Sequence, residues 1–127
     1  MNKEIISTNG APQAIGPYSQ GVKAGNFIFC SGQIPLVPAT GQMVEGGIVA
    51  QTEQVMSNIE ALLGAVGLGF DAVVKTTIYL TDLADFAAVN EVYGSRFAGD
   101  PPARSTVQVS ALPRGAGVEI EVVALVS

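Results

Sequence analysis

A long amphipathic segment between two strand-like runs most constrains the fold of this chain. From Ile48 to about Val66, apolar residues recur at helical spacing and polar residues fall largely on the opposite side. That polar set comprises Gln51, Gln54, Ser57, Asn58 and Glu60. The flanking runs, Phe27–Ser31 and Val73–Leu80, are rich in residues that strands favour. A strand, a helix and a strand in this order predict a right-handed crossover that leaves the two strands parallel.

The strand and helix pattern repeats in the second half of the chain. Asp82 is expected to cap a second helix that runs to about Phe97, and a strand at Arg104–Val109 follows. Further strands are expected at Lys3–Ser7, Tyr18–Ala24 and Val118–Val126. The chain is therefore expected to form one α+β domain over residues 1–127, with one sheet and two helices on one face. The turn-rich connection Ser110–Gly117 favours a simple hairpin between the last two strands.

Low charge predicts that part of the surface is covered by another copy of the chain. The composition is 48% hydrophobic and only 13% charged, and two helices leave the second face of the sheet open. Because so few charges cannot solvate that face, we expect a homo-oligomer. The nearly continuous apolar run Phe27–Cys30 is expected to be covered on both faces.

Composition also narrows the possible chemistry. The net charge is −5 and the six basic residues are scattered, which disfavours nucleic-acid binding. No apolar run could span a membrane and the first residues do not resemble a signal peptide, so a cytoplasmic location is expected. With no histidine and one cysteine, the usual zinc sites and histidine-based acid–base catalysis are not expected. The lone Cys30 is expected to fill the core.

A few polar side chains stand out in otherwise apolar or strand-like runs. Glu119 and Glu121 lie in the apolar run of the last strand, where burying an unpaired charge is costly. Arg104 is either an edge-strand charge, half of a structural ion pair, or a clamp for an anion, because guanidinium matches a carboxylate two-for-two. Asn90 on the apolar face of the second helix is either a structural cross-link or part of a pocket wall.

Six short blocks, taken together, resemble the RidA (YjgF-type) family. They are Gly16–Gln20, Ser31–Pro35, Val74–Leu80, Phe86–Asn90, Pro102–Thr106 and Val118–Glu121. Their order and spacing match over essentially the whole chain. The resemblance implies a chorismate-mutase-like mixed sheet in a homotrimer, with a central barrel of sheets and pockets between subunits. It also implies that the last strand lies antiparallel between the Phe27 and Val73 strands, with the Arg104 strand beyond the latter, in place of the simple hairpin.

The resemblance further implies an enzyme that hydrolyses 2-imino or 2-enamine acids, such as 2-aminoacrylate, to 2-keto acids and ammonia. Such a deaminase protects pyridoxal-phosphate enzymes and uses no metal or organic cofactor. Catalytic roles are implied for Arg104, which would hold the substrate carboxylate, Glu119, which would deprotonate water, and Tyr18, which would close the pocket. Substrate-binding roles are implied for Arg104, Ser31, Gly32, Asn90 and Thr106. Thr106 departs from the cysteine that several family members carry there, so no thiol role transfers.

Two other classes of function stay open at this stage. One is a non-catalytic sensor that binds small keto acids through the Arg104 clamp. The other is an endoribonuclease or translation inhibitor, an activity attributed to some family members. The acidic balance and the lack of histidine disfavour the second class.

Overall fold

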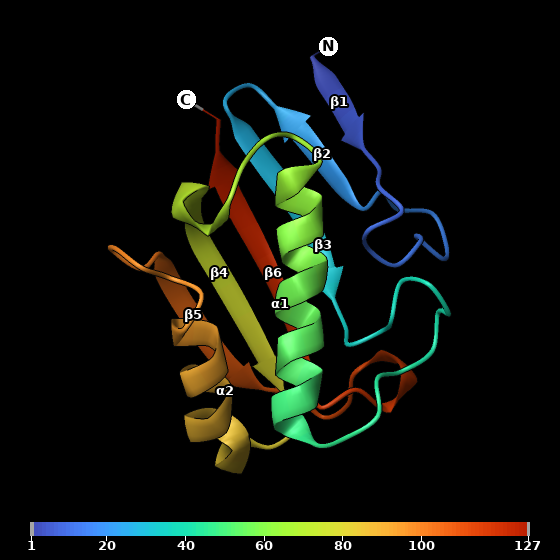
Figure 1. Ribbon diagram of the computed structural model, residues 1–127, viewed down its shortest axis with the longest axis vertical. Coiled ribbons are helices and arrows are strands. Elements are labelled where there is room, and N and C mark those ends of the chain that lie inside the picture. The colour runs from blue at the N-terminus through green and yellow to red at the C-terminus, as the bar shows by residue number, and fades with distance from the viewer. Residues whose placement is uncertain (1, 127) are drawn as a thin grey trace.

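The computed structural model describes residues 2–126, which form one mixed sheet with two helices on one face (Figure 1). The strands are β1 (Lys3–Ile6), β2 (Gly21–Ala24), β3 (Phe27–Gln33), β4 (Val73–Leu80), β5 (Ala103–Gln108) and β6 (Val118–Leu125), and their order across the sheet is β1-β2-β3-β6-β4-β5. Only β4 and β5 pair in parallel, and every other neighbouring pair is antiparallel. The predicted α+β class and the family's strand order are confirmed.

The hairpin favoured by the turn-rich connection is wrong, because β5 and β6 lie on opposite sides of β4. The burial of the two strands explains their places. In β6, alternate residues from Val118 to Ala124 are almost fully buried, as the centre of a sheet requires. The sequence of β5 is more polar and largely exposed, which suits an edge strand.

Helices α1 (Ile48–Gly64) and α2 (Phe86–Gly94) both lie in front of the sheet in Figure 1. The core forms where Val55, Ile59 and Leu62 of α1 pack among the buried residues of β3, β4 and β6. The first predicted helix is confirmed. The second is shorter than predicted. It follows a separate 3₁₀ turn, Leu83–Asp85, that Asp82 caps by accepting from the Ala84 N–H at 2.9 Å.

Asn58 does not lie on the solvent side of α1, where the sequence pattern placed it. Its side chain is fully buried, and its amide donates to the Leu36 carbonyl oxygen at 2.9 Å. Because a buried amide needs such partners, this hydrogen bond ties the loop after β3 to the helix. That loop forms one wall of the cavity described below.

Strand β2 is shorter than predicted, because Tyr18, Ser19 and Gln20 belong to the preceding loop. Gln20 is buried and accepts a hydrogen bond from the Thr8 N–H at 2.7 Å. Its amide also donates to the carbonyl oxygen of Pro12 at 2.7 Å. These bonds fold the loop back on itself and fix the base of the segment that carries Tyr18.

The second face of the sheet is open within one chain. Ile28 and Cys30 of β3 are buried beneath the helices, whereas Phe27 and Phe29 on the other face are 43% and 48% exposed. One face of this run is therefore buried within the chain, and coverage of the other face stays a prediction. Cys30 fills the core as predicted, and burial raises the pKa of its thiol to about 11. Within the described residues, neither helix has the length and apolarity needed to cross a membrane.

Candidate active site

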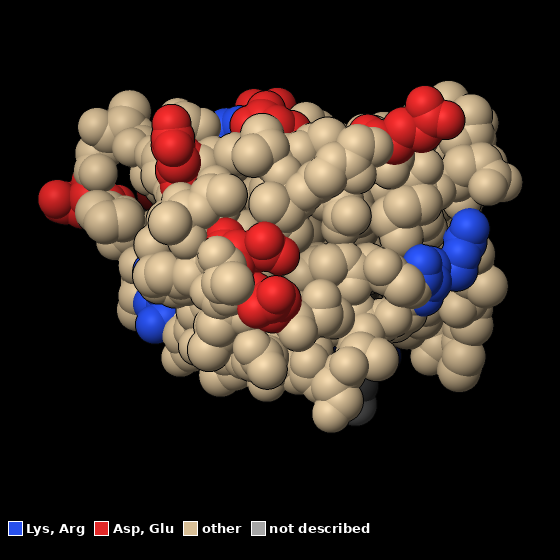
Figure 2. Space-filling view, turned by 90° about the horizontal axis from the view of Figure 1, so that it is seen from below, with Lys and Arg blue, Asp and Glu red and all other residues tan. Residues whose placement is uncertain are grey.

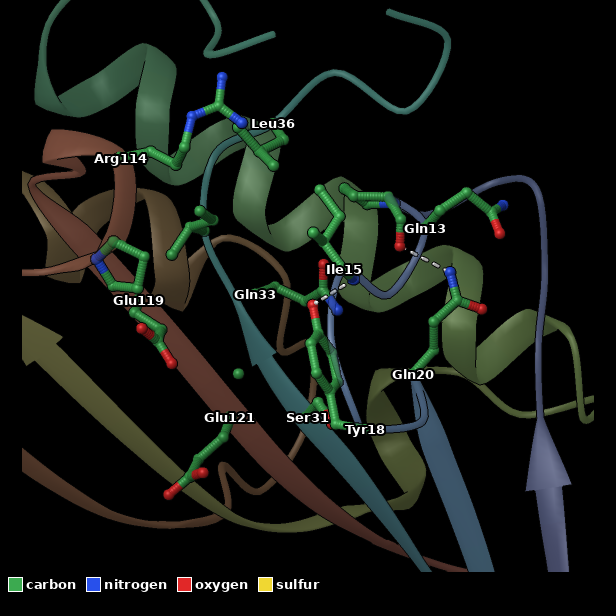
Figure 3. A pocket seen from close by; sticks show the side chains of 14 residues that line it. Gln13, Ile15, Tyr18, Gln20, Ser31, Gln33, Leu36, Arg114, Glu119 and Glu121 are labelled. Carbon is green, nitrogen blue, oxygen red and sulfur yellow. Dashed lines mark hydrogen bonds between the residues drawn. The ribbon is translucent and has the colours of Figure 1, made fainter. Parts of the chain in front are cut away.

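A cavity of about 590 Å³ opens between the loop before β2, the end of β3 and the start of β6 (Figure 3). We call it the carboxylate cavity, because Glu119 and Glu121 of β6 both line it. Its walls also include Tyr18, Ser31 and Gly32. The structure thus brings together four of the residues that the sequence singled out: Tyr18, Ser31, Gly32 and Glu119.

Glu119 owes its position to the alternation of β6. Val118 and Ile120 point into the core, so Glu119 between them points to the open face, opposite Tyr79 of β4. Gly32 approaches this side chain so closely that a Cβ atom on residue 32 would collide with the Glu119 carboxylate. The pairing of β3 with β6 shifts register between Cys30 and Gln33, which lets the backbone at Gly32 make this approach.

The environment of Glu119 favours its protonated form more than water does. Half-burial raises the pKa of its carboxyl, and the negative charge of Glu121 raises it further. A carboxyl with a raised pKa in a cavity is suited to taking up and returning a proton.

Glu121 is a residue of this cavity that the sequence did not assign to the site. Its carboxylate accepts a hydrogen bond from the Tyr79 hydroxyl at 2.8 Å. That bond and the negative charge of Glu121 raise the pKa of the Tyr79 phenol. The available signal was the spacing of the two acids, because residues two apart on a strand share one face.

Tyr18 and Ser31 line the cavity beside the loop before β2. Tyr18 is 53% exposed, and its hydroxyl accepts a hydrogen bond from the Ile15 N–H at 3.3 Å. The Ser31 hydroxyl donates to the carbonyl oxygen of Ser19, next to Tyr18 in the chain. Ser31 therefore links β3 to the loop that presents Tyr18, and its oxygen keeps acceptor capacity for a ligand.

Arg104, Asn90 and Thr106 form a second group, on the opposite face of the sheet. Arg104 of β5 pairs with Thr76 of β4, whose buried hydroxyl bonds Tyr93 of α2, so Arg104 faces the helices. Its guanidinium donates to the Asn90 side-chain oxygen at 2.6 Å. Thr106, two residues along the strand, shares that face, and its hydroxyl oxygen is buried with no hydrogen-bond partner in the described structure.

Within one chain, therefore, Arg104 does not lie beside Glu119. The helix-facing group stands at the outer edge of β5, and the carboxylate cavity lies on the open face between β3 and β6. The residues expected to form one site therefore fall into two groups on opposite faces of the sheet. Among residues 2–126, no three His, Cys, Asp or Glu side chains are grouped so that they could hold a metal ion.

Comparisons with known proteins identify the family to which this fold and these two groups of residues belong. Residues 8–126 match the family model described as Endoribonuclease L-PSP. The chain belongs to this family, which is the RidA (YjgF-type) family that its motifs resemble.

Relatives in this family come from distant organisms and match nearly end to end. Protein DfrA of Myxococcus xanthus is 61% identical, over 98% of this chain and 97% of its own. The 2-iminobutanoate/2-iminopropanoate deaminase of Mus musculus is 50% identical, over 97% of this chain and 91% of its own. Among solved structures, E. coli TdcF with bound serine superposes with a TM-score of 0.93 and 43% identity, over 98% of this chain and 99% of its own.

Proposed function

We propose that this protein hydrolyses 2-imino and 2-enamine acids, such as 2-aminoacrylate, to 2-keto acids and ammonia. The observation that carries the proposal is Glu119, a half-buried carboxyl with a raised pKa in a cavity large enough for a small organic acid. The name of the mouse relative, an imine deaminase at 50% identity, supports the same reaction. The bound serine of the E. coli relative supports a ligand of amino-acid size.

Each residue has a defined part in this reaction. Arg104 binds the substrate carboxylate through two parallel hydrogen bonds. Glu119 removes a proton from water as the water oxygen bonds to the imine carbon, whose C=N bond opens onto nitrogen. The carboxyl returns that proton to the nitrogen, and the hydroxyl proton of the resulting carbinolamine also moves to the nitrogen. The C–N bond then breaks to release ammonia as the C–O bond becomes the ketone C=O of the product. Tyr18 closes the cavity, while the backbone at Gly32 and the hydroxyls of Ser31 and Thr106 contact the substrate.

The proposed site needs two copies of the chain, because Arg104 and Glu119 face opposite sides of the sheet. We propose a homotrimer in which the carboxylate cavity of one copy receives Arg104 of the next. Phe27, Phe29 and Leu125 expose apolar side chains on the open face of the sheet. Because such a group of apolar side chains favours burial, they support contact between this face and another subunit. In this scheme residues 1–127 act as a single domain in the cytoplasm, without a cofactor, and protect pyridoxal-phosphate enzymes from their own reactive intermediates.

A coupled assay tests the activity. A dehydratase acting on serine releases 2-aminoacrylate, and keto-acid formation is followed with and without this protein. We expect acceleration over the spontaneous rate. Glu119→Gln and Arg104→Ala should abolish it, whereas Glu60→Gln, an exposed acid on α1, should retain it. Absence of acceleration by the wild-type protein would refute the proposed reaction.

The shared site has its own test in mixed assemblies. When the two inactive variants, Arg104→Ala and Glu119→Gln, are co-expressed, random assembly should leave both functional residues in about one quarter of the sites. Activity should therefore reappear in the mixture. Mixed oligomers that stay inactive would contradict a site built from two chains.

The family's description as an endoribonuclease favours one competing function, RNA cleavage. Charge argues against it: on the face drawn in Figure 2, acidic and basic side chains are separate spots on a largely uncharged surface, with no extended basic tract. RNA degradation that persists through repeated purification and survives Arg104→Ala would support the competing function. A keto acid that binds without any hydrolysis would instead support a sensor.

A further inference from the structure

The guanidinium of Arg104 contacts three uncharged side chains of α2. Its carbon atom lies 5.4 Å from the ring centre of Phe86 and 5.2 Å from that of Tyr93. One of its terminal nitrogens donates to the Asn90 side-chain oxygen at 2.6 Å. Residues 86, 90 and 93 recur at helical spacing, so one face of α2 supplies all three contacts. We call these three residues the cradle.

Burial and a hydrogen bond to β4 hold Tyr93, one residue of the cradle, in place. The Tyr93 side chain is 5% exposed, and its hydroxyl is hydrogen-bonded to the hydroxyl of Thr76 on β4 at 2.7 Å. Since Thr76 is directly opposite Arg104 in the sheet, strand pairing places the base of the Arg104 side chain beside the Tyr93 ring. Much of the conformational freedom that a long arginine side chain would lose on binding a ligand is therefore lost already on folding.

The cradle also leaves the arginine charge unneutralised. In the described part of the chain, the one ion pair within 4.0 Å joins Arg96 to Glu53, and no acidic side chain contacts Arg104. Aromatic faces and an amide oxygen attract a guanidinium without cancelling its charge. An aspartate at position 90 has nearly the same shape as asparagine, but it would form a bidentate ion pair and occupy the donors that a ligand needs.

We propose that Asn90 is a positioning residue, which together with Phe86 and Tyr93 orients Arg104 while keeping its positive charge available for the substrate carboxylate. This inference rests on the proposed function, because it assumes that Arg104 is the carboxylate clamp. It replaces a direct substrate contact for Asn90 with a role exerted through Arg104. It also explains why an amide, rather than an acid, lies on the otherwise apolar face of α2.

The test compares binding with stability in the same variants. In calorimetry with 2-ketobutyrate, the wild type should bind most tightly, Asn90→Ala less tightly and Asn90→Asp least tightly. The aspartate variant should bind at least about tenfold more weakly than the wild type. Thermal unfolding should give a different order. Asn90→Asp should be at least as stable as Asn90→Ala, because the new ion pair keeps the link between α2 and β5. A merely structural Asn90 would give the same order in both measurements.

Two further variants separate the possible outcomes. Phe86→Leu removes one ring from a partly exposed position and should weaken keto-acid binding without loss of fold. Arg104→Ala should abolish binding, which tests the clamp itself. If Arg104→Ala abolishes binding but Asn90→Asp binds as tightly as wild type, Arg104 binds the carboxylate but the proposed role of the cradle is refuted. If Arg104→Ala binds as wild type does, both the clamp and the cradle fail.

Discussion

Replacing Gly32 with alanine should impair catalysis far more than folding. The backbone at Gly32 has an ordinary negative φ, so alanine is conformationally allowed there. The new methyl group would collide with the Glu119 carboxylate oxygen, and it would also lie 2.9 Å from Cδ and 3.1 Å from Cγ of that side chain. Ordinary contacts between such atoms are about 3.5–4.0 Å. The carboxylate must therefore turn away by on the order of 1 Å or more.

The expected size of the effect follows from that displacement. Misplacing a catalytic group by about 1 Å costs on the order of 10²-fold in rate. Stability should change little, because replacing glycine by alanine at an allowed conformation stabilises by about 0.4–1 kcal/mol and offsets part of the crowding. The variant should thus lose about 10²-fold in kcat in the coupled dehydratase assay, with a Tm close to that of the wild type.

Gly64→Ala provides a matched control, since a Cβ on Gly64 at the end of α1 would meet nothing within 4 Å. It should keep full activity and gain about 0.5–1 kcal/mol of stability. A Gly32→Ala protein with wild-type kcat would refute the assignment of Glu119 as the base. A protein that loses activity only in proportion to its folded fraction would refute the steric argument.

Three further predictions concern the charges and the core. Glu121→Gln removes a negative charge that raises the pKa of Glu119, so Glu119 should ionise at lower pH. The acidic limb of the kcat/KM profile should therefore move to lower pH. A limb that does not move would contradict the coupling between the two carboxyl groups. The Cys30 thiol, with a pKa of about 11, should be inert to a disulfide reagent at pH 8 in the native protein and react only on unfolding; prompt native labelling would contradict its burial. Leu62→Ala empties a fully buried core position and should lower the free energy of unfolding by about 2–5 kcal/mol, measured by urea unfolding at fixed protein concentration. A loss below about 1 kcal/mol would mean that the core repacks to fill the cavity.

Local pattern predicted most of the elements, because each depends on residues near one another in the sequence. The periodicity of α1 and the β-branched run of β4 gave their positions closely. The order of strands could not be read the same way, because pairing depends on contacts between distant segments. Pattern alone favoured a hairpin of β5 with β6, and the correct order came from the family resemblance.

The candidate site was predictable as a list of residues but not as an arrangement. Sequence marked Arg104 and Glu119 because charges in strands need partners. Which face each occupies depends on the strand register, and register placed Arg104 beside the helices and Glu119 on the open face. The two-residue spacing of Glu119 and Glu121 predicted that they share a face, but that this face lines a cavity depends on the loops packed against it.

The central place of β6 has a consequence for how the protein is made. Both strands that pair with β6, β3 and β4, come earlier in the chain. During synthesis each therefore has an unpaired edge until residues 118–125 have left the ribosome. Exposed edges of this kind are templates for aggregation. The sheet can be completed only after translation of β6, so a nascent chain stalled before that point exposes its unpaired edges to those of its neighbours.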